Sequence, residues 1–504
     1  MKILNNHNEL KFIRKENSKK KIILVHGVFD ITHLGHVEYF KEAKSFGDIL
    51  VVSVTSDKFV NKGINRPYFN LKQRMKLLSE LSVIDFVVPS FEKSSLKIIK
   101  SLKPNFYVKG PDYKIEGGDR AGNLDNEEKE VKKKGGELRF TNGNLYSSTQ
   151  ILNETFDIFK ILSKIKKENN LKLNTLQILK DYKNSLEKIK KEKTLIIGEV
   201  ILDNYLYSRP LGTPSKENIL SVNYLRKDVY LGGTVPVVQN ISEINQNITF
   251  ISLYNDKKIK NKIIKKLNKK IKTKFFYDQS FKEIKKNRFI DISTNRKFFE
   301  FYEFNNTEVK NKKILNFLNK NLKKYDKVIA CDFGHGLFTK DVISQLQKKS
   351  NFLCVNAQTN SGNRGFNLFK KFRKADLLVL DEPEIRLGLA DRYHTINELI
   401  NYKSLSSYKN LIVTLGIHGM LLREKKGKKN KNIFLPALNN KAIDTLGAGD
   451  AAYSYASMFS GNTKNLVLIG LLSSIAAAIK TTILGHENYI KFVDVDNSLN
   501  GVLK

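Results

Sequence analysis

Residues 22 to 36 read IILVHGVFDITHLGH, an apolar run followed by a loop with two histidines three positions apart. The apolar run predicts a buried strand, and GHVEYFKEAKSFG, from Gly35 to Gly47, predicts the amphipathic helix that follows it. Further strand-like and helix-like stretches alternate up to residue 110, namely DILVVSVTS, LKQRMKLLSEL, VIDFVVPS, SSLKIIKSL and FYVKG. This alternation predicts a parallel sheet with crossover helices, in which ligands bind at the carboxyl ends of the strands.

The composition predicts a globular protein of two domains. The chain has 504 residues, and a chain of this length usually folds around more than one hydrophobic core. With 41% hydrophobic and 28% charged residues, its composition is that of a globular protein. Its two cysteines, Cys331 and Cys354, lie in apolar runs, so we expect no disulfide framework and a reducing cytoplasmic environment. The longest apolar segment, Leu466 to Ile479, is shorter than the roughly 20 residues of a membrane span, and we expect no membrane partner and no export signal.

The net charge of +37 raises the question of a nucleic-acid partner. Lysine is spread along nearly the whole chain, and no basic, aromatic-interleaved motif of the known nucleic-acid-binding modules is present. The charge therefore indicates a general bias in composition, and a basic surface also attracts phosphorylated small molecules. A basic protein that has nucleotide-binding folds but no turnover remains an alternative hypothesis.

Changes in the apolar pattern divide the chain into three parts. Residues 1–147 form the first α/β domain, and residues 148–192 have helical spacing among many lysines, which predicts a helical linker. A second strand series begins at TLIIGEVILDNY and continues through ISLYND, KVIACDFG, FLCVNAQ, DLLVLDE and LIVTLG. Residues 193–504 are therefore predicted to be a second α/β domain that ends in helices.

The loop GVFDITHLGH is a candidate phosphate site because it joins a strand to a helix. A phosphate there meets free N–H groups and the positive end of the helix dipole, and Gly35 allows the backbone to approach closely. His33 and His36 can donate hydrogen bonds to its oxygens, which suits transfer at a nucleotide α-phosphate. Two structural histidines, or two ligands of a metal site, are the alternatives.

This segment resembles the cytidylyltransferase-like nucleotidyltransferases. GINRPYFNLKQR, VIDFVVPSFEKSS, KPNFYVKGPDYK, KKGGELRF and YSSTQI resemble, in this order, the adenylyltransferase half of the bifunctional ADP-heptose synthases. The resemblance implies that His33 and His36 are catalytic and that a set of residues binds ATP or CTP: Gly27, Phe29, Asp30, Gly35, Arg74, Lys109, Ser148 and Thr149. The alternative for Arg74 is an exposed charge on a helix.

A second candidate site lies at residues 444 to 455, which read DTLGAGDAAYSY. Gly447, Ala448 and Gly449 precede Asp450 and an apolar helix, so that the turn forms an anion hole at the helix start. The Asp450 carboxylate can accept the proton of an attacking sugar hydroxyl. Together these features predict a kinase, and the chain has neither a Walker A sequence nor the protein-kinase motifs.

The string around Asp450 resembles the signature of the ribokinase-like sugar kinases. The resemblance implies that Asp450 is catalytic, that Mg²⁺ is the cofactor and that ATP is the phosphate donor. It also implies roles for nucleotide-side residues Thr414, Gly416, Gly447, Ala448 and Gly449, substrate-side residues Asp203, Gly232 and Gly233, and metal ligands Asp381 and Glu384.

Several positions depart from that family. Pro236 stands where these kinases usually have an asparagine that helps to hold the sugar, and Glu199 stands where an aspartate is common. Residues 355–360, VNAQTN, replace a more usual Asp-Pro pattern. The transferase part also comes first in this chain, whereas the synthase used for comparison has its kinase first. The acceptor of the kinase therefore stays open.

Taken together, the motifs predict a bifunctional transferase of sugar-nucleotide synthesis. One site is expected to phosphorylate a sugar or sugar phosphate, and the other to couple a sugar 1-phosphate to a nucleotide. The resemblance makes an ADP-heptose-type compound the leading candidate for the product. A kinase half with a different acceptor or reduced activity is the alternative. We expect small-molecule substrates, a cytoplasmic location and a homo-oligomer.

Overall fold

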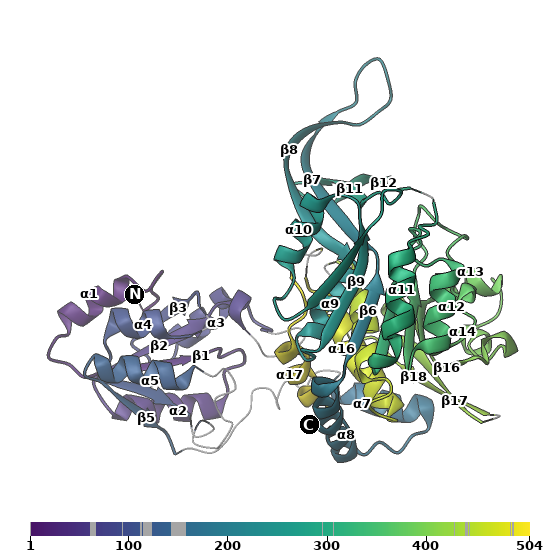
Figure 1. Ribbon diagram of the computed structural model, residues 1–504. Coiled ribbons are helices and arrows are strands. Elements are labelled where there is room, and N and C mark those ends of the chain that lie inside the picture. The colour runs from purple at the N-terminus through teal and green to yellow at the C-terminus, as the bar shows by residue number, and fades with distance from the viewer. Residues whose placement is uncertain are drawn as a thin grey trace. The chain divides into compact units, whose positions relative to one another are not determined.

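The computed structural model describes residues 2–60, 67–92, 94–110, 113, 123–142, 158–294, 296–305, 307–427, 429–438, 442, 444–483, 485 and 488–503. Its Cα atoms form two compact units, Met1–Lys160 and Ile161–Lys504. Each unit contains sheet and helices of its own, as Figure 1 shows, and each is described by itself.

The first unit is built on a parallel sheet of five strands in the order β3-β2-β1-β4-β5. These strands are β1 (Ile22–Gly27), β2 (Ile49–Thr55), β3 (Phe86–Ser90), β4 (Phe106–Lys109) and β5 (Glu137–Phe140). The chain adds β2 and β3 on one side of β1 and then places β4 on the other side. The carboxyl ends of β1 and β4 therefore flank the switch point at which open α/β sheets bind ligands. The predicted parallel sheet is confirmed.

Helices cover both faces of this sheet. Ile22 and Leu24 of β1 share one core cluster with α1 (Glu9–Glu16), α4 (Leu96–Leu102) and α5 (Leu124–Lys133). Ile23 and Val25 share the other cluster with α2 (Leu34–Ser45) and α3 (Leu71–Ser79). Because both faces are buried, β1 is an unbroken apolar run and not an alternating one.

The second unit contains a sheet of nine strands in the order β10-β9-β6-β13-β14-β15-β16-β17-β18. The strands up to β16 pair in parallel, and the last two pair antiparallel. They are β6 (Thr194–Gly198), β9 (Ile248–Tyr254), β10 (Lys272–Tyr277), β13 (Lys327–Asp332), β14 (Leu353–Ala357), β15 (Ala375–Asp381), β16 (Tyr408–Thr414), β17 (Met420–Lys426) and β18 (Lys429–Leu435). The switch point of this sheet lies between β6 and β13.

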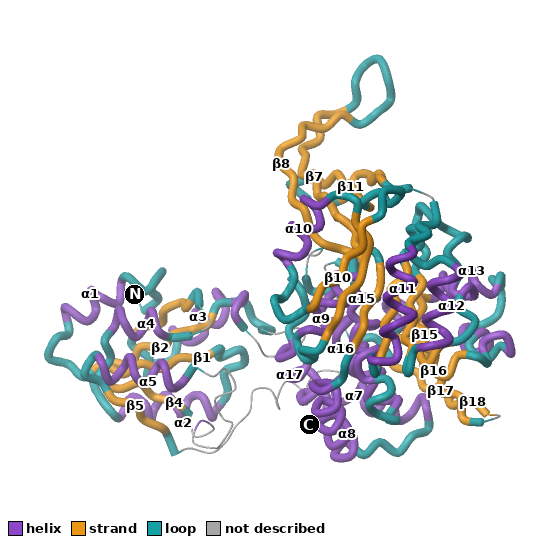
Figure 2. The backbone as a smooth tube through the Cα atoms, in the orientation of Figure 1, coloured by secondary structure: helices purple, strands orange, loops and turns teal. Residues whose placement is uncertain are grey.

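A second sheet of this unit has the order β12-β11-β7-β8. Its strands are β7 (Val200–Gly212), β8 (Ser221–Gly233), β11 (Ile284–Asp291) and β12 (Lys297–Glu303). The hairpin of β7 and β8 projects from the rest of the unit in Figures 1 and 2. β11 pairs in parallel with β7, although the two strands are far apart in the sequence. This pairing places Lys286 opposite Asp203.

Helices complete the second unit. They are α9 (Thr234–Ser242), α10 (Lys257–Lys266), α11 (Lys312–Asn321), α12 (Lys340–Lys349), α13 (Glu382–Leu389), α14 (Ile396–Leu399), α15 (Ala448–Phe459), α16 (Leu466–Lys480) and α17 (Phe492–Leu503). α15 and α16 are buried along almost their whole length, which explains their apolar sequences. No helix in the described part of the chain combines the length and the apolar character that a bilayer crossing needs.

Two further helices, α7 (Ile158–Asn169) and α8 (Thr175–Lys191), occupy the segment with helical spacing. The Tyr182 hydroxyl donates to Asp496 at 2.9 Å, and the Asn169 amide donates to the carbonyl of Phe434 at 2.8 Å. These bonds attach both helices to the second unit.

Candidate active sites

The two histidines of the first unit stand at the start of α2. His33 is the residue before the helix and has extended backbone, and its N–H donates to Nδ1 of His36 at 3.4 Å. The two ring centroids are 3.9 Å apart. The hydroxyl of Thr32 is buried and has no hydrogen-bond partner among the described residues. With the N–H groups and positive dipole end of the helix, the loop offers an anion a site that carries two imidazoles.

Gly27 and Phe29, which precede the two histidines, pack against each other. The Phe29 backbone has a φ of 48°, and its buried ring lies 5.5 Å from the His36 ring and 5.2 Å from the Phe40 ring. A Cβ atom on Gly27 would lie 2.8 Å from Cζ of Phe29, so a larger residue there would displace the Phe29 ring. Phe29 thus packs in the core under His36. Gly35 lies in the first turn of α2 and is half-buried.

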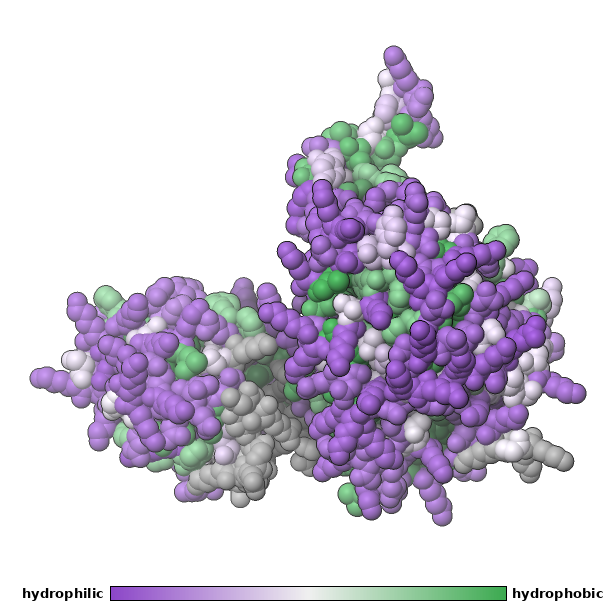
Figure 3. Space-filling view, in the orientation of Figure 1, coloured by the Kyte–Doolittle hydropathy of each residue, from purple (hydrophilic) through white to green (hydrophobic). Residues whose placement is uncertain are grey.

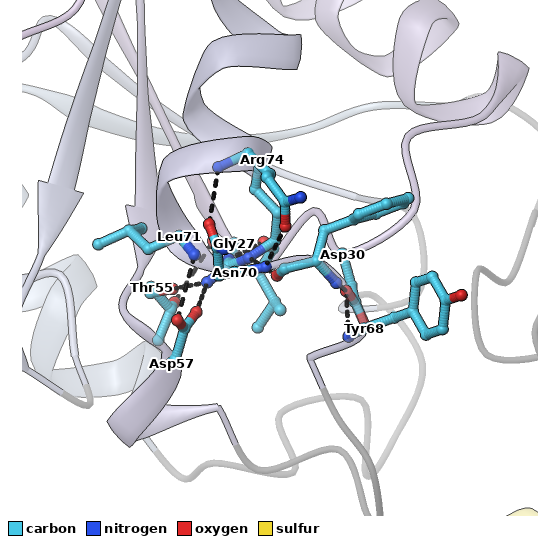
Figure 4. A network of polar contacts seen from close by, with 11 residues as sticks. Gly27, Asp30, Thr55, Asp57, Tyr68, Asn70, Leu71 and Arg74 are labelled. Carbon is cyan, nitrogen blue, oxygen red and sulfur yellow. Dashed lines mark hydrogen bonds and ion pairs between the residues drawn. The ribbon is translucent and has the colours of Figure 1, made fainter.

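Asp30 joins the histidine loop to the loop before α3, as Figure 4 shows. Its Oδ1 accepts hydrogen bonds from the backbone N–H groups of Tyr68 (2.7 Å) and Phe69 (3.1 Å). Asp30 is 1% exposed. The carboxylate therefore fixes the two loops to each other.

Arg74 binds backbone at the same place (Figure 4). Its guanidinium donates to the carbonyls of Phe69, Val28 and Thr55, and it forms an ion pair of 2.6 Å with Asp57. Because its side chain is fully buried, the alternative of an exposed helix charge is wrong. The structure places Arg74 as a link between the carboxyl ends of β1 and β2.

Lys109 ends β4, on the other side of the switch point. Its buried ammonium lies 3.5 Å from Oε2 of Glu127, a buried residue of α5. His26 of β1 is 3.1 Å from the Ser53 hydroxyl, and burial, followed by the charge of Lys109, lowers the pKa of His26 to about 4. His26 is therefore neutral at pH 7. Neither His26 nor Glu127 was singled out from the sequence. Glu127 is one of many charged residues in α5, so nothing in the sequence distinguishes it.

The structure thus brings the histidine loop and Lys109 to the ends of two neighbouring strands, β1 and β4. Ser148 and Thr149, which complete the predicted nucleotide-binding set, lie outside the described residues.

In the second unit, Asp450 lies in the first turn of α15. The residue before this helix, Gly447, has a φ of 79°, and a Cβ on Gly449 would meet open space. The Gln358 amide, just after β14, donates a hydrogen bond of 2.6 Å to Oδ1 of Asp450. Burial raises the pKa of Asp450 to about 6, although Gln358 and Lys286 act to lower it. Asp450 is therefore ionised at neutral pH and can accept a proton.

Residues 191–454, more than half of the chain, match the family model of the pfkB family of carbohydrate kinases. The chain belongs to the pfkB family. Residues 24–154 match the model of the cytidylyltransferase-like family. Both families predicted from the motifs are confirmed, in the order cytidylyltransferase-like first and pfkB second, and so is the predicted α/β fold.

The curated relatives are matched over a short segment. "Bifunctional protein HldE" of Blochmanniella pennsylvanica is 46% identical over 101 residues, which are 20% of this chain and 21% of that protein. The protein of the same name from Helicobacter pylori J99 is 45% identical over 100 residues, or 19% of this chain and 22% of that protein. The chain thus matches about a fifth of the length of these relatives.

Two solved structures align with 62% of this chain. They are a ribokinase from Thermotoga maritima, at 19% identity and a TM-score of 0.46 over 98% of that protein, and phosphofructokinase-2 from Escherichia coli, at 12% identity and a TM-score of 0.49 over all of that protein. The kinase assignment rests on the family match and on the geometry around Asp450.

Asp203, which the sequence predicts to bind substrate, is buried on β7 of the pfkB unit. Nη1 of Arg288, on β11, forms an ion pair with Oδ1 of Asp203, and Nε of Arg288 donates to Glu300 at 3.0 Å. Arg288 therefore holds the Asp203 carboxylate in place. The sequence gave no signal for Arg288, because its position depends on the pairing of β11 with β7.

Lys286 and His335 are two further residues of this site that sequence reasoning missed. Burial lowers the pKa of Lys286, and the charges of Asp203 and Asp450 act on its ammonium. Burial and then Lys286 lower the pKa of His335 to about 4, and neither nitrogen of its ring has a hydrogen-bond partner within the described ranges. Lys286 is thus close enough to Asp203 and Asp450 for both charges to act on it.

The predicted magnesium ligands Asp381 and Glu384 lie at the carboxyl end of β15. The Glu384 carboxylate accepts the backbone N–H groups of Thr359 (3.0 Å) and Asp381 (2.8 Å), and Oδ1 of Asp381 accepts the N–H of Glu384 at 2.7 Å. The pair therefore forms a capping box at the start of α13. Burial, followed by the charge of Asp381, raises the pKa of Glu384, and Asp450 adds to this shift.

The remaining predicted residues lie at strand ends of the pfkB unit. Thr414 ends β16, and Gly416 follows it with a φ of 57°. Gly232 and Gly233 end β8, and a Cβ on Gly233 would lie 2.5 Å from the carbonyl oxygen of Glu199. Gly233 is therefore required by the close approach of two backbones.

Two of the positions at which the sequence departs from the ribokinase-like pattern, Glu199 and Asn356, are also buried. The Glu199 carboxylate accepts the N–H groups of Phe333 (3.1 Å) and His335 (3.2 Å), and burial followed by the charge of Asp332 raises its pKa. The Asn356 amide donates to the carbonyl of Val379 at 2.9 Å, so this residue bonds to the neighbouring strand. Glu199 shapes the turn after β13.

Proposed function

We propose that this chain is a bifunctional enzyme of sugar-nucleotide synthesis. Its pfkB unit phosphorylates a sugar or sugar phosphate with ATP, and its first unit transfers a nucleotidyl group from ATP or CTP to a sugar 1-phosphate, with release of pyrophosphate. The observation that carries the proposal is the buried Asp450 carboxylate in the first turn of α15. The resemblance to ADP-heptose synthases and the name of the relatives, bifunctional protein HldE, favour an ADP-heptose-type product.

In the kinase reaction, the acceptor hydroxyl attacks the γ-phosphorus of ATP while Asp450 takes its proton, and ADP leaves. The N–H groups at the start of α15 stabilise the charge that develops on the transferred phosphoryl group. The hydrogen bond from Gln358 orients the Asp450 carboxylate. Positioning and charge stabilisation supply most of the rate enhancement in phosphoryl transfer.

Asp381 and Glu384 fit a Mg²⁺ ion that enters with ATP. Mg²⁺ is bound by one or two carboxylates together with water and phosphate oxygens. Burial and neighbouring carboxylates raise the pKa of Glu384, which means that they oppose its ionisation. A bound cation would offset this repulsion between the carboxylates. The two carboxylates would hold the ion, which would supply positive charge that offsets the charge of the nucleotide phosphates. Within the described ranges, no group of three or more His, Cys, Asp or Glu side chains that could hold a metal ion is present.

Lys286 and Arg288 support an acceptor that carries a phosphate group. They are two residues apart on β11, so they lie on one face of that strand, next to Asp203 of β7. Arg288 is charge-balanced by Asp203 and Glu300, and Lys286 adds a further cation. A cation at this place attracts a phosphorylated sugar more strongly than a neutral one.

In the transferase reaction, an oxygen of the sugar 1-phosphate attacks the α-phosphorus of the nucleotide, and pyrophosphate leaves. The neighbouring rings of His33 and His36 lie at the start of α2, where their N–H groups can donate to the oxygens of the α-phosphate. Lys109 at the end of β4 adds positive charge at the same switch point. No covalent participation of the protein is needed.

Pro236 favours a second candidate, a pfkB unit with a different acceptor. This residue is buried near the start of α9, next to the turn at Gly233. Proline offers no side-chain hydrogen bond to a sugar, whereas the kinases that this segment resembles have an asparagine there. A screen of free and phosphorylated sugars for ATP consumption separates the two candidates, and a clear preference for heptose 7-phosphate excludes the second.

We also propose a homo-oligomer that assembles through the hairpin of β7 and β8. β8 is an edge strand, and exposed apolar side chains gather on the hairpin, as Figure 3 shows. They are Leu211, Ile219, Leu220, Tyr224, Leu225 and Val229. Exposed edges of this kind pair with another strand. Light scattering of the intact chain and of the Leu220→Glu/Leu225→Glu variant tests this, and an unchanged molar mass contradicts it.

We propose domain boundaries at residues 1–147, 148–192 and 193–504, with a cytoplasmic location. α7 and α8 lie within the proposed linker, the pfkB match begins at the last residue of α8, and both helices are hydrogen-bonded to the second unit. Cys331 and Cys354 are buried free thiols, which are compatible with a reducing compartment.

Mass spectrometry of reaction products tests the proposed function. The purified chain is given ATP, CTP, Mg²⁺ and a panel of sugar phosphates. We expect a sugar bisphosphate from the pfkB unit, and a nucleotide sugar with pyrophosphate when a sugar 1-phosphate is present. Absence of both products over the whole panel would overturn the proposal.

A further inference from the structure

Lys109 occupies an unusual place for a lysine. It is the last residue of β4 and is 5% exposed. It follows Val108, which pairs with Val25 of β1, so Lys109 lies beside the strand end that leads into the histidine loop. The carboxyl end of β4 lies at this switch point, the region where ligands of such sheets bind.

Aromatic rings surround the ammonium group. Nζ of Lys109 lies 4.9 Å from the ring centroid of Tyr107 and 4.7 Å from that of Tyr113. Aromatic faces attract a cation, but they replace little of the water that a buried ammonium has lost. Desolvation alone therefore favours the neutral amine.

Glu127 supplies the opposite charge. Its Oε2 lies 3.5 Å from Nζ of Lys109, which is longer than the roughly 2.7–2.9 Å of a charge-assisted hydrogen bond. The interaction is therefore mainly electrostatic. It balances the charge of the ammonium without fixing its direction.

The Glu127 carboxylate is itself held by two other groups. Oε1 accepts the backbone N–H of Ser95 at 2.7 Å, and Oε2 accepts the Tyr107 hydroxyl at 2.9 Å. Burial acts to raise the pKa of Glu127, but the charge of Lys109 and the bond from Ser95 outweigh it, and the pKa lies below its usual value. Glu127 is therefore ionised at neutral pH, in a fixed position.

We propose that Glu127 is a positioning residue of the transferase site. It keeps Lys109 charged at the end of β4, so that a nucleotide phosphate at the switch point meets an ammonium and not a neutral amine. This inference rests on the proposed nucleotidyltransferase function. A carboxylate that only links α4, α5 and β4 would stabilise the fold without changing how nucleotide binding depends on pH.

The Glu127→Gln variant of the full chain tests the proposal, because it keeps the shape of the side chain and removes its charge. Pyrophosphate release is measured against nucleotide concentration from pH 6.5 to 9.5. For the unaltered chain we expect a nucleotide KM that changes less than about twofold over this range, since Lys109 stays charged. For Glu127→Gln, in which the desolvation of the amine is no longer offset by this opposite charge, we expect the KM to rise with pH over this range, with a much smaller change in kcat.

Two controls separate positioning from stability. Tyr107→Phe removes a hydrogen bond to the same carboxylate oxygen but leaves the charge, and it should keep a flat pH profile. Glu127→Asp also keeps the charge and should stay flat even if its thermal stability is lower. An alkaline rise of KM in either control that matches Glu127→Gln contradicts the proposal.

A third variant links the effect to the lysine. In the Lys109→Met background, Glu127→Gln should produce no alkaline rise, because the titrating amine is gone. A rise that persists there, or a wild-type KM and a flat profile in Glu127→Gln itself, overturns the role of Glu127. If the unaltered chain releases no pyrophosphate from any nucleotide and sugar phosphate, the proposed transferase function has failed instead.

Discussion

The side-chain amide of Gln358 donates a hydrogen bond of 2.6 Å to Oδ1 of Asp450. This bond favours the ionised carboxylate, whereas burial, the largest influence, raises the pKa of Asp450 to about 6. A general base has to be ionised in order to accept a proton. The kinase reaction is therefore expected to be active above this pKa and to lose activity below it.

The first prediction is the pH dependence of the kinase. We expect kcat/KM for the acceptor to fall about tenfold per pH unit below the pKa near 6. Gln358→Leu should move the midpoint to higher pH, because it removes a donor to the carboxylate. A coupled ADP assay from pH 5 to 9 measures both curves. A rate that stays level down to pH 5 contradicts Asp450 as the base.

The second prediction is that each site can be inactivated alone. Asp450→Asn keeps the shape of the side chain but takes away the proton acceptor, so kinase activity should fall by about 10²–10⁴-fold. His36→Ala removes one imidazole from the start of α2, and pyrophosphate release should fall by about 10²–10³-fold. Both reactions are assayed with both variants. Loss of both activities in either single variant contradicts independent sites.

The sequence predicted the positions of both candidate sites because each lies where a strand or turn meets a helix. The apolar run before His33 and the glycine turn before Asp450 are local signals, and the structure has α2 and α15 beginning at these residues. Local signals can also be ambiguous. The spacing of Asp381 and Glu384 resembles a metal motif, and the same two residues form a capping box at the start of α13.

Residues whose positions depend on distant pairing were not predictable. Lys286 and Arg288 come from a lysine-rich stretch with no distinctive pattern, and they lie next to Asp203 only because β11 pairs with β7. The backbone contacts of Arg74 were not predicted either: its guanidinium is buried against carbonyls of segments that are distant in the sequence, and its predicted nucleotide contact stays a prediction. No spacing rule in the sequence encodes contacts of this kind.

The third prediction concerns Mg²⁺. Burial and the charge of Asp381 raise the pKa of Glu384, so a proton competes with the metal at this carboxylate. At a fixed concentration of MgATP, the free Mg²⁺ that gives half-maximal kinase rate should therefore decrease as pH rises from 6 to 9. Glu384→Gln should need more Mg²⁺ and lose most of this pH dependence. An identical Mg²⁺ requirement in the variant contradicts the assignment.

The fourth prediction concerns Lys286. Lys286→Met removes the charge and should raise the acceptor KM of the kinase by about 10–100-fold, which corresponds to the free energy of one hydrogen bond to a charged group. Lys286→Arg should restore part of the lost affinity. Because burial lowers the pKa of Lys286, the alkaline loss of activity should begin below pH 10.5. Lys285→Met is the matched control, since Lys285 pairs with Glu303 at 2.9 Å. Equal effects of the two substitutions contradict a role for Lys286.

The fifth prediction concerns stability in the first unit. Arg74→Met leaves the carbonyls of Phe69, Val28 and Thr55 without their donor, and we expect the unit to lose about 3 kcal/mol of unfolding free energy. Lys76→Met on the same helix removes only an exposed ion pair with Glu80 and should cost less than about 0.5 kcal/mol.

Hydrogen exchange with mass spectrometry measures this effect where it occurs. The chain has no tryptophan, so exchange in peptides from β1 and β2 is a more local probe than fluorescence. Exchange there should speed up in Arg74→Met but not in Lys76→Met, while peptides of the second unit stay unchanged. Unchanged exchange in β1 and β2, together with a raised nucleotide KM, would show that Arg74 acts on the ligand and not on the strand ends.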